Sequence, residues 1–139
     1  MTKQLLIGGQ ALVELGLSRH TRDINYLIKD QSSPFAFIVD TTLNIGYVNA
    51  NGSTFLNAVW QHEQANLGSI ASPQALLELQ AYSFVRHSLE GNWNQADEAE
   101  FDIKFLARKF SLTGFKIIQR FVSETQSAEI RQIIDLIRK

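Results

Sequence analysis

Cysteine is absent from this sequence of 139 residues, and proline occurs only twice. Without cysteine the chain can form no disulfide, no thiolate zinc site and no cysteine nucleophile. Charge is scarce as well, because charged residues make up 19% of the chain and the formal net charge is −1. A chain so near neutrality has no global attraction to nucleic acid or to an anionic membrane, so neither is expected as a partner.

Long hydrophobic runs are also missing. No stretch approaches the roughly 20 apolar residues that a membrane span requires. The run Leu5–Ile7 near the N-terminus is too short for the core of a signal peptide. The sequence therefore predicts a cytoplasmic protein. Hydrophobic residues still make up 45% of the chain, which suits a single domain over residues 1–139 with its own core.

The spacing of apolar residues predicts an α+β fold in two parts, a small sheet with helices over about residues 1–70 and a helical part over about 71–139. In the first part we expect strands at 5–7, 23–28, 35–39 and 43–48, and helices at 10–15 and 54–60. In the second part we expect helices at 73–90, 96–110, 117–122 and 130–137. Ser72-Pro73 marks the start of the first of these, with serine as N-cap and proline at the first helical position.

Four features of the first 28 residues together carry chemistry: Gly8-Gly9, Gly16, Arg19-x-Thr21 and Asp23-x-Asn25. Glycines at a helix start let a phosphate approach bare backbone N–H groups. Residues two apart on a strand face the same side, so Asp23 and Asn25 are expected to face one site. Each feature alone has a structural reading, such as a tight turn or a solvated loop, and the joint spacing favours a site.

The string from Leu6 to Asn25 resembles the opening of the nucleotidyltransferase superfamily. It is closest to small bacterial members related to minimal nucleotidyltransferases and to AbiE-type abortive-infection toxins, which read Gly-Gly-x-Ala…Gly…Arg-x-Thr-x-Asp-x-Asp. Two later segments, Ile70–Leu77 and Asp102-Ile103-x-x-Leu106, resemble helices of the same group. The resemblance implies a small mixed sheet with an N-terminal helix and a C-terminal helical part.

In that family three carboxylates bind two magnesium ions, and a hydroxyl attacks the α-phosphate of a nucleoside triphosphate. Carried onto this chain, the resemblance implies that Gly8, Gly9, Arg19 and Thr21 bind the nucleotide. It also implies that Asp23 and Asn25 hold catalytic, magnesium-binding positions. A nucleoside triphosphate and Mg²⁺ are therefore the ligands to expect if the chemistry is retained.

Three positions depart from the family pattern. Asn25 stands where the second carboxylate is expected, and no acidic residue lies in 43–48, where Gly46 or Asn44 falls near the third. Gln80 stands where relatives commonly carry a lysine. Magnesium prefers charged oxygen ligands, so the two missing carboxylates weaken the metal site, and the missing lysine removes a contact to the triphosphate. The sequence leaves open whether Asp40, under a different strand register, or Asp102 supplies a missing carboxylate.

These departures predict a nucleotidyltransferase fold with impaired or absent catalysis. If activity survives, it would be magnesium-dependent nucleotidyl transfer. The alternatives are a nucleotide-binding sensor and a non-catalytic interaction protein, acting as a homodimer or in a toxin–antitoxin-like pair. Trp60 and Trp93 are read as core or interface aromatics, and Asp97, Glu98 and Glu100 as an acidic helix face.

Overall fold

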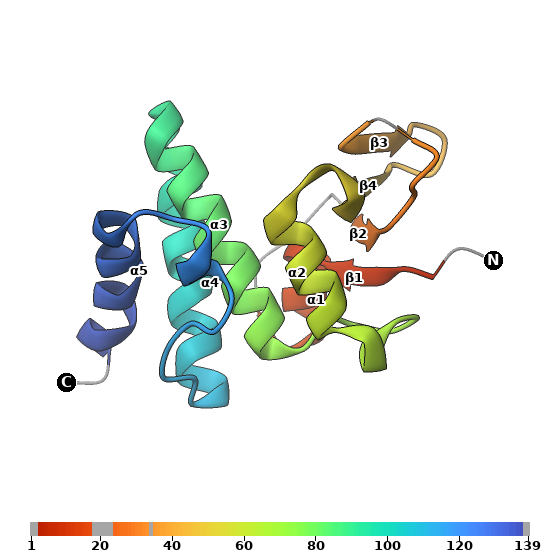
Figure 1. Cartoon of the computed structure of the whole chain (residues 1–139). Coiled ribbons are helices and arrows are strands. Elements are labelled where there is room, and N and C mark those ends of the chain that lie inside the picture. The colour runs from red at the N-terminus through yellow and green to blue at the C-terminus, as the bar shows by residue number, and fades with distance from the viewer. Residues whose placement is uncertain (1–2, 18–23, 34, 138–139) are drawn as a thin grey trace. The chain divides into compact units, whose positions relative to one another are not determined.

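The computed structural model describes residues 3–17, 24–33 and 35–137. It confirms the α+β class, because helices and one four-stranded mixed sheet make up the described part of the chain (Figure 1). The chain divides into two compact units, an N-terminal unit over Met1–Ala75 and a C-terminal unit over Leu76–Lys139. None of the helices in the described ranges is long and apolar enough to cross a membrane.

The sheet of the N-terminal unit has the strand order β1-β2-β4-β3. Its strands are β1 (Leu5–Ile7), β2 (Ile24–Ile28), β3 (Phe37–Asp40) and β4 (Ile45–Asn49). β1 is antiparallel to β2, β2 is parallel to β4, and β3 and β4 form an antiparallel hairpin. The sheet is therefore mixed, and the hairpin matches the two strands expected at 35–39 and 43–48.

The first strand passes directly into the first helix. β1 ends at Ile7, and α1 (Gly8–Glu14) begins at the next residue. Gly8 has a φ of +71°, a left-handed conformation that glycine adopts at no steric cost. The helix therefore begins two residues before the predicted start at Gln10. Its buried residues Ala11 and Leu12 pack toward β1 and β2, which anchors the strand-to-helix junction.

The connection from the sheet to α3 is held by a buried carboxylate. Ser53 caps α2 (Thr54–His62), because its Oγ accepts the N–H of Leu56 at 3.2 Å. Glu63, which follows α2 and is 1% exposed, accepts hydrogen bonds from the N–H and the Oγ of Ser72. Ser72 in turn caps α3 by accepting the N–H of Ala75 at 3.2 Å, as the Ser-Pro signal predicts. The chain between Glu63 and Ser72 is thus held at both ends by these side-chain hydrogen bonds.

The two edges of the sheet differ in their backbone pairing. The residues just before α3 run beside β1, where the N–H of Leu6 donates to Ser69 at 2.9 Å and the N–H of Ala71 donates to Leu6 at 3.0 Å. β3 lies at the other edge, and within the described residues its strand partner is β4 alone. Backbone groups on the outer side of β3 are consequently open to pairing.

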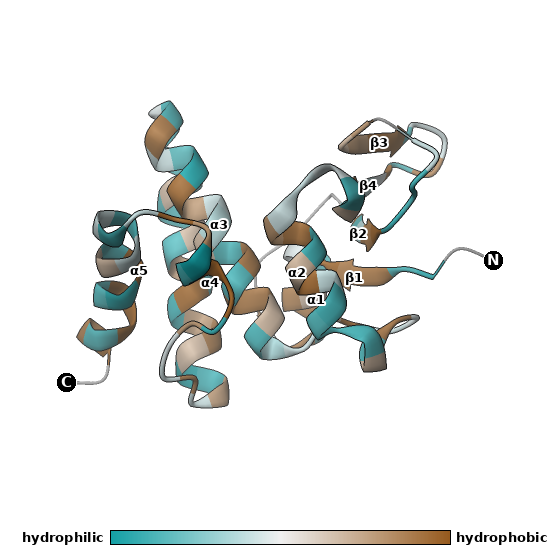
Figure 2. Cartoon of the chain, viewed as in Figure 1, coloured by the Kyte–Doolittle hydropathy of each residue, from teal (hydrophilic) through white to brown (hydrophobic). Residues whose placement is uncertain are grey.

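The C-terminal unit is helical, with α3 entering it from the N-terminal unit. Its helices are α3 (Pro73–Glu90), α4 (Trp93–Phe110) and α5 (Glu124–Ile137). α4 contacts α5, and both present buried apolar residues such as Ile103, Leu106, Ile130 and Ile134. Figure 2 shows the alternation of apolar and polar bands along α5 that such one-sided burial requires.

The predicted helix over 117–122 is wrong. A short 3₁₀ turn, η3 (Ile118–Arg120), stands in its place, and α5 begins only at Glu124. Ser123 starts α5 through a reciprocal cap, since its Oγ accepts the N–H of Gln126 and its own N–H donates to the Gln126 side chain.

A buried carboxylate explains why the chain turns at η3. Glu78 of α3 is fully buried, and its oxygens accept the N–H groups of Lys116 at 2.9 Å, Ile117 at 3.0 Å and Ile118 at 2.9 Å. Three consecutive N–H groups converge on this carboxylate, as those of a first helical turn could, but the bonds that follow, from Arg120 to Ile117 and from Phe121 to Ile118, span three residues and form a 3₁₀ turn. The segment therefore forms a nest around Glu78, and Ile117 and Ile118 are buried on either side of it.

Replacing Glu78 tests how much this nest contributes. Glu78→Ala leaves three inward-facing N–H groups without an acceptor, so we expect the free energy of unfolding to fall by about 3 kcal/mol or more. Thermal and urea unfolding followed by circular dichroism would measure this. Glu129→Ala, at an exposed position of α5, is the control and should change stability by less than about 0.5 kcal/mol. Equal losses in the two variants would contradict the assignment.

Candidate functional site

A pocket of about 380 Å³ opens on one face of the sheet in the N-terminal unit. It brings together three positions that the sequence singles out, namely Gly8, Asn25 and Gly46. The complete lining is Ile7, Gly8, Asn25, Phe37, Val39, Asn44, Ile45, Gly46 and Val48. All four strands contribute to the lining, and β1 contributes only its last residue, Ile7. We call this cavity the sheet pocket.

Strand register explains why these residues meet. Asn25 pairs with Ile7 of β1 on one side and with Gly46 of β4 on the other, and Gly46 pairs with Val39 of β3. Four strands therefore contribute one residue each to a single row across the sheet. Asn25 and Gly46 are direct neighbours in that row, at the places where the family resemblance implies the second and third carboxylates.

No side chain fits at position 46 beside its present neighbours. A Cβ on Gly46 would lie 2.5 Å from the Oδ1 of Asn25 and 2.8 Å from the Cζ of Phe37. Contacts this short are not tolerated between non-bonded heavy atoms, so the neighbours would have to move. The space that a third carboxylate would need is therefore taken by an amide and an aromatic ring.

The Asn25 amide also approaches Gly8. A Cβ on Gly8 would lie 3.4 Å from the Nδ2 of Asn25, so the amide lies between the two glycines with its oxygen toward Gly46 and its nitrogen toward Gly8. A side-chain amide carries no charge and offers both a donor and an acceptor. Gly9, by contrast, is the second residue of α1 and does not line the pocket.

Several predicted site residues cannot be related to this pocket. Arg19, Thr21 and Asp23 lie outside the described residues. Gln80 lies on α3 and Asp102 lies on α4, both in the C-terminal unit. Asp102 is 2% exposed and takes part in a polar interaction.

Asp40 has a structural task in the hairpin. Its Oδ1 accepts the N–H groups of Thr42 at 3.0 Å and Leu43 at 3.1 Å, which closes the turn between β3 and β4. Because neighbouring strand residues face opposite sides, Asp40 faces away from the side on which Val39 lines the pocket. Asp40 is accordingly not among the lining residues.

The lining was tested for its fit to magnesium. The described residues of the pocket carry two side-chain amides and no carboxylate. More widely, the described ranges contain no group of three His, Cys, Asp or Glu residues arranged to hold a metal ion. Magnesium requires hard, preferably anionic oxygen ligands. The described residues alone therefore do not fit the two-magnesium centre that the resemblance implies, and no reaction step through magnesium is derived.

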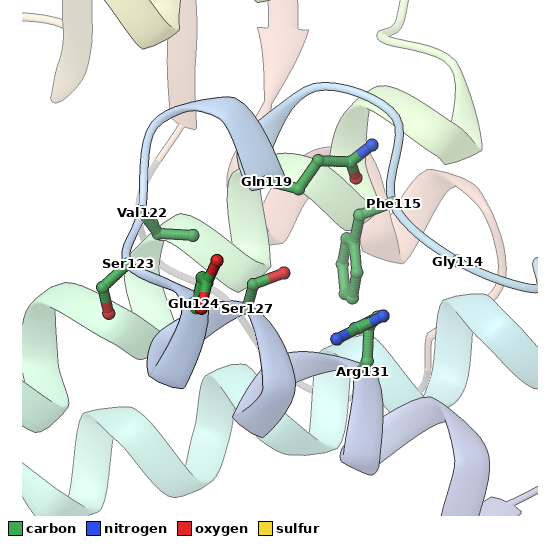
Figure 3. Close-up of a pocket in the computed structure, with 8 residues that line it drawn as sticks. All are labelled: Gly114, Phe115, Gln119, Val122, Ser123, Glu124, Ser127 and Arg131. Carbon is green, nitrogen blue, oxygen red and sulfur yellow. The ribbon is translucent and has the colours of Figure 1, made fainter.

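A second cavity, of about 700 Å³, lies in the C-terminal unit between η3 and α5 (Figure 3). Figure 3 shows the Arg131 side chain next to the Phe115 ring, with Ser127 and Glu124 farther along the same helix. These three helix residues share one face through their spacing of three and four. The cavity offers one cation, one anion and hydroxyl groups, but no nucleophile paired with a base. Sequence reasoning missed it, although the shared face of α5 was a signal.

Comparison of the chain with protein-family models, curated proteins and solved structures found no match. The resemblance to nucleotidyltransferases is carried by the residues from Leu6 to Asn25 and by the two later segments alone.

Gly46→Ala tests the packing of the sheet pocket. We expect the free energy of unfolding to fall by about 1–2 kcal/mol, because the new methyl group displaces Asn25 and Phe37. In an Asn25→Ala background the same change should cost about 1 kcal/mol less, since the clash with Oδ1 is gone. Fluorescence of the buried Trp60 during urea unfolding, in Trp93→Phe chains, would measure both values. Strict additivity would contradict the proposed contact.

Proposed function

We propose that this chain is a nucleotidyltransferase-like protein that binds a nucleotide in the sheet pocket without transferring its nucleotidyl group. The observation that carries the proposal is the position of the Asn25 amide between Gly8 and Gly46. In the family that the sequence resembles, carboxylates at positions 25 and about 46 would hold metal ions. In this chain Asn25 and Gly46 occupy these positions, and a neutral amide and a glycine suit nucleotide binding better than metal-assisted transfer.

The chemistry of the lining favours the base and sugar of a nucleotide. The cavity of about 380 Å³ lies within the size range of small-molecule sites, about 300–1,000 Å³. Asn25 can donate to and accept from the edge of a base at once, and an aromatic ring such as that of Phe37 offers a face for stacking. Arg19 and Thr21 would contact the phosphates, as the resemblance implies.

Without a second carboxylate, Asp23 would hold a divalent ion weakly. Each lost negative charge lowers the affinity of a site for magnesium, which sheds its water reluctantly. Nucleotide binding would then depend little on magnesium. This separates the proposal from the catalytic alternative, in which the nucleotide is held largely through the metal.

A specific observation favours the interaction protein as the second candidate. The edge strand β3 and its flanks expose large apolar side chains, and Figure 2 colours this strand as strongly hydrophobic. Phe35 is 66% exposed, Phe37 54%, Val39 51% and Leu43 62%. An open edge with such residues suits the addition of a strand from a protein partner. Such a partner fits the toxin–antitoxin-like setting that the resemblance implies.

Calorimetric titration distinguishes these functions. We expect ATP, GTP, CTP or UTP to bind with a Kd in the micromolar to millimolar range, and removal of magnesium by EDTA to change it less than about threefold. Asn25→Ala should weaken binding about tenfold, because a hydrogen-bonding group in the pocket is lost. Asn94→Ala, at an exposed position of α4, is the matched control and should bind as the unaltered chain does.

Two results would overturn the nucleotide-binding proposal. The first is absence of heat with all four nucleotides at millimolar concentration while circular dichroism shows the fold intact, which would favour the interaction protein. The second is release of pyrophosphate that requires magnesium and disappears in Asp23→Asn, which would restore the enzyme.

A further inference from the structure

One face of α4 exposes aromatic side chains and charges together. Trp93 and Phe101 are 63% and 59% exposed, although both are large and apolar. Asp97 lies between them, and Arg108 follows two turns after Phe101. The spacing of these residues, three or four positions at each step with Lys104 included, puts them on one face of the helix. We call this face the α4 stripe.

The charges on the α4 stripe and directly beside it are separated by sign. Asp97 and Glu98 precede Phe101, whereas Lys104, Arg108 and Lys109 follow it. Arg108 and Lys109 lie in the last turn of α4 and complement the helix dipole there, whereas the first turn has no acidic residue. The helix dipole explains neither the positions of Asp97 and Glu98 nor the exposure of Trp93 and Phe101. Clustered exposed aromatics mark surfaces that are covered in a complex.

The residues after Phe101 surround a small hollow. It has a volume of about 370 Å³ and is lined by Phe101, Lys104, Phe105, Arg108 and Lys109. Lys109 stacks over the Phe105 ring at 5.7 Å, and Lys104 pairs with Glu100 at 3.5 Å on the same helix. An exposed pair of this kind contributes little, so Lys104 can exchange it for another carboxylate at small cost.

We infer that the α4 stripe is the interface between two copies of this chain, with the two α4 helices antiparallel about a two-fold axis at Phe101. In that arrangement a residue a given number of positions after Phe101 faces the residue the same number before it on the other copy. Lys104 then faces Glu98, and Lys109 faces Trp93. The two Phe101 rings meet at the axis.

The distribution of charge along α4 favours a second copy of this chain as the partner. An antiparallel pairing sets the basic half of each stripe against the acidic half of the other, so the surface is complementary to itself. A parallel pairing would oppose like charges. Lys109 over Trp93 would add a cation–π contact, for which tryptophan is the best partner. A single pair of helices makes a small interface, so we expect a reversible dimer with a Kd on the order of micromolar.

Single-stranded nucleic acid is the rival occupant, because cations beside exposed phenylalanines also suit phosphates and bases. Asp97 and Glu98 lie on the same side of the helix and would repel a phosphate backbone. A second copy uses these carboxylates, whereas a nucleic acid must avoid them. The inference does not depend on the sheet pocket or on the nucleotide proposed to bind there.

Sedimentation equilibrium of the full chain between about 1 μM and 1 mM tests the interface. We expect a monomer–dimer equilibrium. Phe101→Ala should weaken it at least about tenfold, because its central contact is lost. The double variant Lys104→Glu, Arg108→Glu should do the same, because position 104 then sets a carboxylate against Glu98 and the basic half of the stripe loses its net positive charge.

Charge reversal on both halves provides the decisive variant. Adding Asp97→Lys and Glu98→Lys to the double variant restores opposite charges where position 104 faces position 98 and exchanges the signs of the two halves, so it should restore the dimer to within about threefold. Arg131→Glu on α5 and Asn25→Ala in the sheet pocket are the controls and should leave dimerisation unchanged. Circular dichroism at 222 nm checks that each variant retains its helices.

Three outcomes would overturn the inference. One is a chain that stays monomeric up to 1 mM, and another is a fourfold variant that fails to dimerise although it is folded. The third is a monomer that binds a fluorescent dT oligonucleotide and loses this binding in the Lys104→Glu, Arg108→Glu variant, which would assign the stripe to nucleic acid instead.

Discussion

The sheet pocket depends on one steric constraint, which is that the space beside Gly46 is already occupied and leaves no room for a side chain at that position. The parallel pairing of β2 with β4 sets Asn25 next to Gly46, and the amide of Asn25 together with the ring of Phe37 fills this space. From this follow the absence of space for an acidic residue at position 46, the neutral lining and the position of the amide near Gly8. A change at any one of these positions must be matched at the others, because they share the same volume.

Much of the fold could be predicted because its signals are local. Runs of β-prone residues located the strands of the hairpin, and Ser72-Pro73 located the start of α3. The wrong helix over 117–122 shows the limit of such signals. Ile117, Ile118, Phe121 and Val122 have helical spacing, but their backbone is held by Glu78, about forty residues earlier. Sequence periodicity carries no information about a hydrogen bond over that distance.

The candidate site could be predicted in part for the same reason. Gly8 and Asn25 were identified by motif, and Gly46 by its approximate place in a strand, and all three line one pocket. Their spacing in the sequence could not indicate that Phe37 reaches the same row, since this depends on the register between β3 and β4. Asp40 illustrates the converse. Its position in the sequence made it a candidate for the missing carboxylate, whereas in the structure it accepts the hydrogen bonds that close the turn between β3 and β4.

Glu78 has a consequence for the order in which the C-terminal unit forms. Its three hydrogen bonds join residues 38 to 40 positions apart, so they close a long loop that contains α4. Contacts between distant residues form late, because closing the intervening loop costs entropy before any contact compensates for it. On a ribosome, a chain released only as far as α4 would hold this carboxylate without its donors. The N–H groups of residues 116–118 are thus needed before the buried carboxylate of Glu78 is fully hydrogen-bonded.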